Sequence, residues 1–193
     1  MKKTHQTFFA LTMCFCQSVS GQGYFVFNNF GSGPPSWFAP VFDSAGTPLE
    51  GDSYLAMLYV GPDASSLEPV TSFGNGQIAV VPFVVGGFVS GGIVRAGNVG
   101  GGADVRAQMR AWYAPLGATY EEAVQAGKGG YGASSVFQTV SGFETGAGVI
   151  PLPLRGLESF SLLPVVPEPG VLSLLLLGVP VLWLAGRQRK RKS

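Results

Sequence analysis

Hydrophobic and polar residues alternate over the eleven residues from 103 to 113. Successive side chains of a β-strand point to opposite faces, so this pattern predicts a strand with one buried and one wet side. The predicted buried side carries Ala103, Val105, Ala107, Met109, Ala111 and Tyr113. The opposite side carries Asp104, Arg106, Gln108, Arg110 and Trp112. Trp112 is therefore a large aromatic residue on an otherwise polar face.

Shorter apolar segments between turn residues predict further strands. They cover residues 21–30, 54–60, 77–85, 88–94, 136–140 and 157–163. Gly74-Asn75-Gly76 is a turn signal of the Asn-Gly kind that separates two of them. Short strands with a turn about every ten residues favour an all-β fold, an antiparallel β-sandwich of jelly-roll-like form.

One short helix is expected after residue 118. Thr119 and Glu122 have the spacing of a capping box, in which each side chain satisfies a free amide at the start of a helix. Gly127 suits the position just past the helix end, where the backbone adopts a left-handed conformation. The sequence thus predicts a helix from about 120 to 126.

Composition supports a β-rich domain and excludes a helical bundle. The 193 residues include 29 Gly and 14 Pro, both of which interrupt helices. Aromatic residues make up 12% of the chain, which argues against disorder. The length suits one modest domain with targeting segments at its ends.

The formal net charge of +1 hides a strong asymmetry along the chain. Between residues 24 and 166 there are five basic and ten acidic residues, a net charge of −5. The other seven basic residues all lie at the two ends of the chain. An acidic domain repels phosphate backbones, so we expect no nucleic-acid partner.

Residues 1–22 have the organisation of a signal peptide. Lys2 and Lys3 form a positive start, 7–19 is an apolar run, and Ser18-Val19-Ser20 supplies small residues for cleavage. A buried N-terminal helix is the alternative. Signal peptidase and the export machinery are the partners expected from this segment.

Removal of that segment would leave a domain without cysteine or histidine. Cys14, Cys16 and His5 are the only such residues, and all precede residue 23. Disulfides, thiolate or imidazole metal sites and the usual nucleophilic triads are then excluded. We therefore expect no cofactor and no metal.

The C-terminus has three parts in a fixed order. Residues 166–170 contain Pro167-Glu168-Pro169, whose prolines disfavour a helix. Residues 170–186 form an uncharged apolar run, at the short end of what spans a bilayer as a transmembrane helix. Positive charges stay in the cytoplasm, so the basic end anchors the tail there. These charges are Arg187, Arg189, Lys190, Arg191 and Lys192.

This tripartite order, together with a signal peptide, resembles the PEP-CTERM sorting signal of exported bacterial proteins. The resemblance covers the last 28 or so residues, with Pro167, Glu168 and Pro169 as the sorting motif. It implies recognition by a membrane-embedded exosortase, cleavage near the motif, and transfer to the cell surface or extracellular matrix. A plain, uncleaved tail anchor is the alternative. The expected organisation is a signal peptide (1–22), a β-sandwich ectodomain (23–164) and a sorting signal (165–193, with basic tail 187–193).

The spacing of the acidic residues in the ectodomain indicates neither a catalytic carboxylate pair nor a known calcium-binding motif. Glu121 and Glu122 are adjacent, so on a helix they point apart, and Glu122 has a capping role. Asp43, Glu50 and Asp52 could bind calcium through oxygen, but their spacing fits no EF-hand, and turn stabilisation is the favoured interpretation. The Gly-Gly pairs lack the Lys-Ser or Lys-Thr of a phosphate loop.

Three function classes remain, and the first is favoured. It is a non-enzymatic surface or matrix protein displayed through a processed tail. The second is a carbohydrate-binding module for exopolysaccharide, with Trp112 as a stacking platform flanked by Arg106 and Arg110. For Trp112 itself, the favoured interpretation is that the other sheet covers it or that the arginine stems shield it. The third is a carboxylate-dependent glycosidase, which needs a cleft with two carboxylates about 5–10 Å apart.

Overall fold

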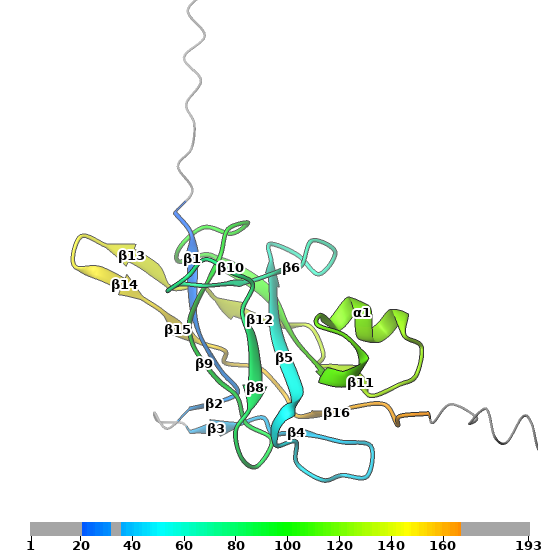
Figure 1. Cartoon of the computed structure of the whole chain (residues 1–193). Helices are drawn as coiled ribbons and strands as arrows, with labels where there is room; N and C mark the ends of the chain where they lie inside the picture. Colours follow the sequence, from blue (N-terminus) through cyan, green and yellow to red (C-terminus); the bar gives the residue numbers. More distant parts are fainter. Residues whose placement is uncertain (1–20, 32–35, 167–193) are drawn as a thin grey trace, which may run out of the picture.

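The structure is a computed structural model that describes residues 21–31 and 36–166 (Figure 1). Most of the predicted signal peptide lies outside the described residues. So do the Pro167-Glu168-Pro169 motif, the predicted transmembrane run and the basic tail. Within the described ranges, no helix has the length and apolar character needed to cross a membrane.

Four strands form the first sheet, in the order β15-β1-β9-β7. Phe25 and Phe27, two residues apart on β1 and so on the same face, are both fully buried. β1 pairs antiparallel with β9 but parallel with β15. The strands are β1 (Gly23–Asn28), β7 (Thr71–Ser72), β9 (Ser90–Ala96) and β15 (Leu152–Pro153).

Six strands form the second sheet, in the order β11-β10-β5-β6, with β12 also on β10 and β8 also on β5. At the centre of this sheet, β5 and β10 pair antiparallel. The pairing runs from Arg106 opposite Gly61 to Tyr113 opposite Tyr54. The strands are β5 (Gly51–Gly61), β6 (Glu68–Pro69), β8 (Val80–Phe83), β10 (Asp104–Tyr113), β11 (Tyr131–Ala133) and β12 (Phe137–Val140).

Three two-stranded pairs complete the β structure. β13 and β14 form a hairpin that projects from the body, at the left of Figure 1. β16 pairs parallel with β4, and β2 pairs antiparallel with β3. The strands are β2 (Phe30–Gly31), β3 (Trp37–Phe38), β4 (Val41–Phe42), β13 (Phe143–Thr145), β14 (Gly148–Ile150) and β16 (Phe160–Ser161).

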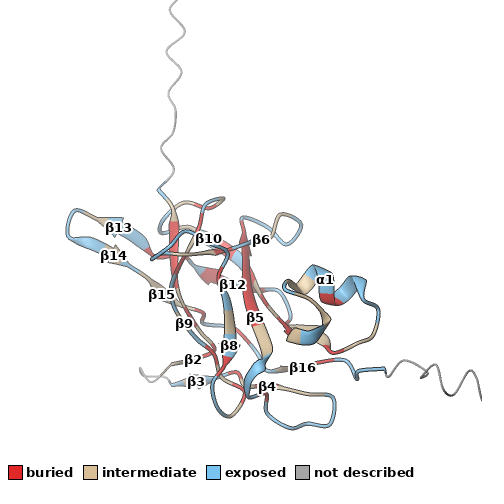
Figure 2. Ribbon diagram, in the orientation of Figure 1, coloured by how far each residue is buried: buried red, intermediate tan, exposed pale blue. Residues whose placement is uncertain are grey.

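The two larger sheets share one hydrophobic core. Phe25 and Phe27 from β1 lie in the same buried cluster as Leu58 from β5 and Met109 from β10. Figure 2 shows these buried positions along β1 and β5, while the β13–β14 hairpin is largely exposed. Full burial of each such side chain contributes about 1.5–3 kcal/mol, so this core is the main stabilising element.

The predicted short helix is present as α1 (Tyr120–Gln125), preceded by a 3₁₀ turn, η1 (Ala114–Leu116). The Thr119 hydroxyl accepts a hydrogen bond from the Glu122 amide at 3.2 Å. The Glu122 carboxylate accepts from the Ala118 amide at 2.7 Å, one residue before the position that a standard capping box uses. Gly127 has φ +66°, the left-handed conformation expected after the helix end.

The all-β class with one short α-helix is confirmed, and β10 confirms the alternating strand. Other strand bounds differ in both directions: β5 is longer than the predicted 54–60, whereas two predicted strands were too long. The run 77–85 contains only β8, and 157–163 contains only β16. The expectation of purely antiparallel pairing was wrong for β15 and β16, each of which pairs parallel with a strand far away in the sequence.

Candidate functional site

Trp112 is fully buried, with 0% of its surface exposed. Its indole Nε1 donates a 2.9 Å hydrogen bond to the Gly117 carbonyl. The ring meets Tyr120 edge-on, at 6.4 Å between centroids. The interpretation of Trp112 as an exposed stacking platform is therefore wrong, and the favoured one, a covered Trp112, is confirmed. The cover is η1 and α1 on the polar face of β10, not the other sheet.

A second, smaller core lies on this outer face of the second sheet. Trp112 shares it with Met57 and Tyr59 from β5 and Ala123 from α1. Partly buried side chains close its rim. They are Leu55, Leu67, Leu116, Tyr120 and Tyr131. The helix α1 thus packs against one end of the outer face of the second sheet.

Arg110 is engaged inside the protein rather than presented to a ligand. Its guanidinium lies 3.8 Å from the centroid of the Tyr59 ring and 5.2 Å from that of Tyr120. Its Nη1 is 3.2 Å from Glu121 Oε1, and its Nε donates to Gln108 Oε1 at 2.9 Å. These contacts satisfy the charge and hold α1 to β10.

Tyr59 completes this network. Its hydroxyl donates to Glu121 Oε1 at 2.7 Å. Burial raises the pKa of Tyr59 well above the usual value for tyrosine, the hydrogen bond to Glu121 raises it further, and Arg110 partly opposes both. Tyr59 is consequently a neutral donor at physiological pH, and Glu121 is bound within the network.

Arg106 lies on the same strand, four residues from Arg110 and so about 13 Å away at 3.3 Å per residue. It is exposed and lines a small groove of about 100 Å³ with Pro62, Asp104 and Gln138. The structure therefore places Arg106 apart from Arg110 and Trp112, both of which contact Tyr120.

A larger groove of about 310 Å³ lies beside it, between β12 and β15. Gln138 borders both grooves, and Arg155 lines the larger one. The rest of the larger lining is Thr139, Val140, Leu152 and Pro153. The two grooves place Arg106 and Arg155 on either side of Gln138. Sequence reasoning missed this surface, because its residues come from distant segments and no local pattern indicates that they meet.

Of the three carboxylates considered for calcium, Asp43 and Glu50 stabilise turns and loops, and Asp52 is exposed at the start of β5. Asp43 Oδ1 accepts the amides of Ala45 and Thr47, both at 2.8 Å. Glu50 Oε1 accepts the Gly86 amide at 3.2 Å. Across residues 21–31 and 36–166 no group of three or more metal-binding side chains is present.

The chain remains hydrogen-bonded to the domain up to Val166. Leu163 donates to the Tyr131 carbonyl and accepts from the Gly130 amide, both at 2.9 Å. Val166 donates to the Lys128 carbonyl at 2.7 Å. Sequence reasoning missed that segment 128–131 pairs with this end of the chain. The only local sign is Gly129-Gly130, which marks an unusual backbone conformation there. Both glycines have positive φ, which only glycine adopts readily.

A third groove, of about 270 Å³, opens beside this end of the chain and is lined by Asp43, Tyr54, Leu163 and Val165 among others. Each of the three grooves has at most one carboxylate in its lining. None of them therefore offers the carboxylate pair that glycoside hydrolysis requires.

Comparison with known proteins adds no family to this description. No family model matches the chain, and no curated protein or solved structure matches it. The function of the protein is therefore inferred from its residues and their geometry.

Proposed function

We propose that this protein is a non-enzymatic surface or matrix protein, exported by its N-terminal signal peptide and sorted by an exosortase through a PEP-CTERM tail. The observation that carries the proposal is the order of segments along the sequence. Pro167-Glu168-Pro169 is followed by the uncharged apolar run 170–186 and then by the basic cluster 187–192. A signal peptide at the other end of the chain completes the pattern of an exported protein with a sorting tail.

The properties of the motif suit an enzyme substrate. Pro167 and Pro169 restrict the backbone, which lowers the ordering cost when such a segment enters a binding groove. Glu168 adds a carboxylate that a basic pocket would select. The basic residues after Gly186 hold the end of the chain in the cytoplasm, so the domain faces outward.

The domain itself we propose to be a β-sandwich of jelly-roll-like form that serves for display. The shared core between the two larger sheets supports this architecture, since residues from β1 and β10 belong to one buried cluster. Burial of Trp112 and the pairing of Arg110 with Glu121 use these residues for folding. Trp112 is therefore not available as an exposed stacking platform.

The test compares processing with insertion. Pro167→Ala with Glu168→Ala should block processing, so that unprocessed chain accumulates in the inner membrane. Leu172→Ala with Ser173→Ala, just outside the motif, is the matched control and should be processed normally. An immunoblot of fractionated host cells, with one tag in the domain and one after Ser193, reports both. Normal processing of the first variant would reassign the tail as a plain anchor.

Carbohydrate binding is the second candidate, and the groove between β12 and β15 favours it over Trp112. Arg155 lines this groove, Arg106 lines the smaller one, and Gln138 borders both, so their guanidinium and amide groups can donate hydrogen bonds to saccharide oxygens. Loss of binding to the host exopolysaccharide in Arg106→Ala with Arg155→Ala would support this role. Unchanged binding, or none in the unaltered protein, would remove it.

A further inference from the structure

The end of the described chain is an apolar edge. Leu163, Val165 and Val166 have 52%, 47% and 61% of their surface exposed, although their backbone is tied to residues 128–131. We call the two segments 128–131 and 162–166 together the exit edge. Three large apolar side chains so exposed within four residues are unusual for a surface that faces water.

The length of chain beyond this edge limits how far the domain can stand from a membrane. Val166 is five residues before Val171, where the apolar run begins. Five residues span at most about 18 Å even when fully extended. The headgroup layer on one side of a bilayer takes up about 5–8 Å of that distance. Val166 can therefore lie at most about 10 Å from the outer surface of the headgroup layer, which is about the spacing between two packed sheets.

We propose that the exit edge lies against the phospholipid surface while the tail is inserted, with Leu163, Val165 and Val166 in the interfacial layer. The inference rests on the proposed function, because it requires the apolar run to be in the membrane. Burying apolar side chains in the interface is favourable, and the short connector makes the encounter intramolecular.

The charges at this edge are compatible with such contact. Asp43 lines the groove beside Leu163 and Val165, but its Oδ1 already accepts two backbone amides. No other ionisable side chain lines that groove apart from Tyr54.

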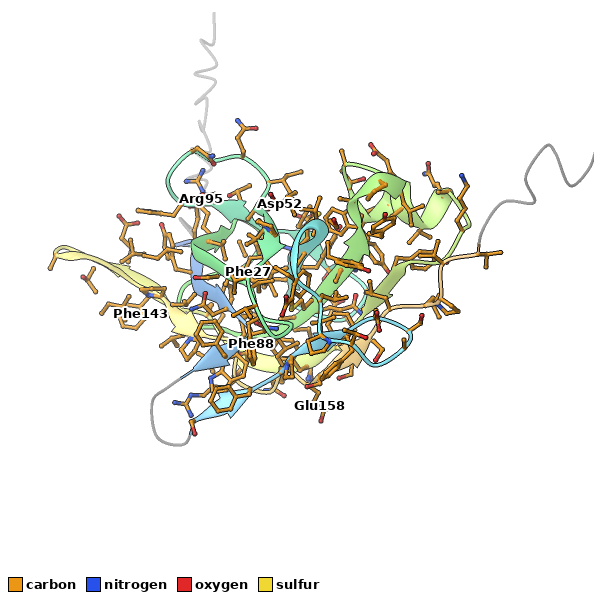
Figure 3. The ribbon with its side chains drawn as sticks, turned by 60° about the horizontal axis from the view of Figure 1, so that its bottom comes forward. Phe27, Asp52, Phe88, Arg95, Phe143 and Glu158 are labelled. Carbon is orange, nitrogen blue, oxygen red and sulfur yellow. The ribbon has the colours of Figure 1, made fainter. Side chains whose placement is uncertain are left out.

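The rest of the domain is oriented by this contact. In Figures 1 and 3 the β13–β14 hairpin, with Phe143, lies at the left and β16 leads to the right. Ala147 is an exposed residue of the turn between β13 and β14, and this hairpin lies on the opposite side of Figure 1 from β16, so position 147 should face away from lipid.

The experiment places a fluorescent probe at each position in turn. The full chain carries Cys14→Ser and Cys16→Ser, and one new cysteine, Val165→Cys or Ala147→Cys, is labelled with a nitrobenzoxadiazole dye. Each protein is reconstituted into phosphatidylcholine–phosphatidylglycerol vesicles with and without lipid spin-labelled near the headgroup. Flotation with the vesicles and protection of a tag after Ser193 establish that the tail is inserted.

We expect several-fold stronger quenching at position 165 than at position 147, with a blue-shifted emission at 165. Equal, weak quenching at both positions in vesicles that do contain the inserted tail would overturn the inference and leave the proposed function intact. Failure of the protein to float with the vesicles would overturn both.

Discussion

The hydroxyl of Tyr59 on β5 donates a 2.7 Å hydrogen bond to Oε1 of Glu121 on α1. The same oxygen is 3.2 Å from Arg110 of β10, whose guanidinium lies on the Tyr59 ring. Three side chains from three elements therefore form one closed network over the second core. Such networks fix how a helix sits on a sheet, because each member is satisfied by the others.

Glu121→Ala should destabilise the protein by about 1–3 kcal/mol, since it leaves the buried Tyr59 hydroxyl without its carboxylate acceptor. Glu68→Ala is the matched control, an exposed glutamate on β6 that should change stability by less than about 0.5 kcal/mol. Urea unfolding followed by tryptophan fluorescence measures both. Equal stability of the two variants would show that the network contributes nothing.

The raised pKa of Tyr59 predicts that the free energy of unfolding falls at alkaline pH. Its folded-state pKa lies above the unfolded value of about 10, so the contribution to stability is complete below pH 10 and is lost as pH rises above it. The slope from one such group is at most about 1.4 kcal/mol per pH unit. Between pH 10 and 12, the unfolding free energy of Tyr59→Phe should therefore fall less steeply than that of the unaltered protein. Parallel curves would contradict the assignment.

Trp112→Ala should cost about 3–5 kcal/mol, the usual penalty for removing a large aromatic side chain from a core. Trp112→Phe should cost less, because it keeps most of the packing and loses the hydrogen bond to Gly117. Thermal unfolding measures both. A Trp112→Ala protein as stable as the original would restore Trp112 as a surface platform.

Asn29 is fully buried and joins three segments. Its Nδ2 donates to the carbonyls of Ala39 (2.8 Å) and Gly87 (2.9 Å), and its Oδ1 accepts the Val89 amide at 2.8 Å. Asn29→Ala leaves these groups unsatisfied and should cost at least about 3 kcal/mol. Asn75→Ala, in the exposed turn where Oδ1 accepts only the Gln77 amide among the described contacts, should cost under about 1 kcal/mol. Similar midpoints in guanidinium unfolding would refute the difference.

Gly129→Ala should release the end of the chain from the domain. Gly129 has φ +71°, and an added Cβ would collide with the Pro164 carbonyl oxygen. Hydrogen exchange of the Val166 amide should accelerate at least about tenfold, while amides of β5 stay protected. Gly74→Ala, where a Cβ meets open space, should leave the exchange unchanged. Unaltered protection in Gly129→Ala would show that the end is held by other contacts.

The sequence by itself determined the β class, the alternating strand, and the start and end of α1. These depend on neighbours in the chain: side chains two residues apart share a strand face, and Thr119 caps an amide three residues on. The tail proposal likewise depends on a linear order of motif, apolar run and basic cluster, so no fold is needed to state it.

Tertiary structure decided which predicted faces are covered and which distant segments meet. Alternation places Trp112 on the polar side of β10, yet α1 buries it, because helix packing over a sheet depends on contacts that no local period encodes. The pairing of β16 with β4 and of Leu163 with residues 130 and 131 joins segments far apart in sequence. Such contacts follow from the shared burial of apolar surface, and they set the exit edge from which the tail leaves.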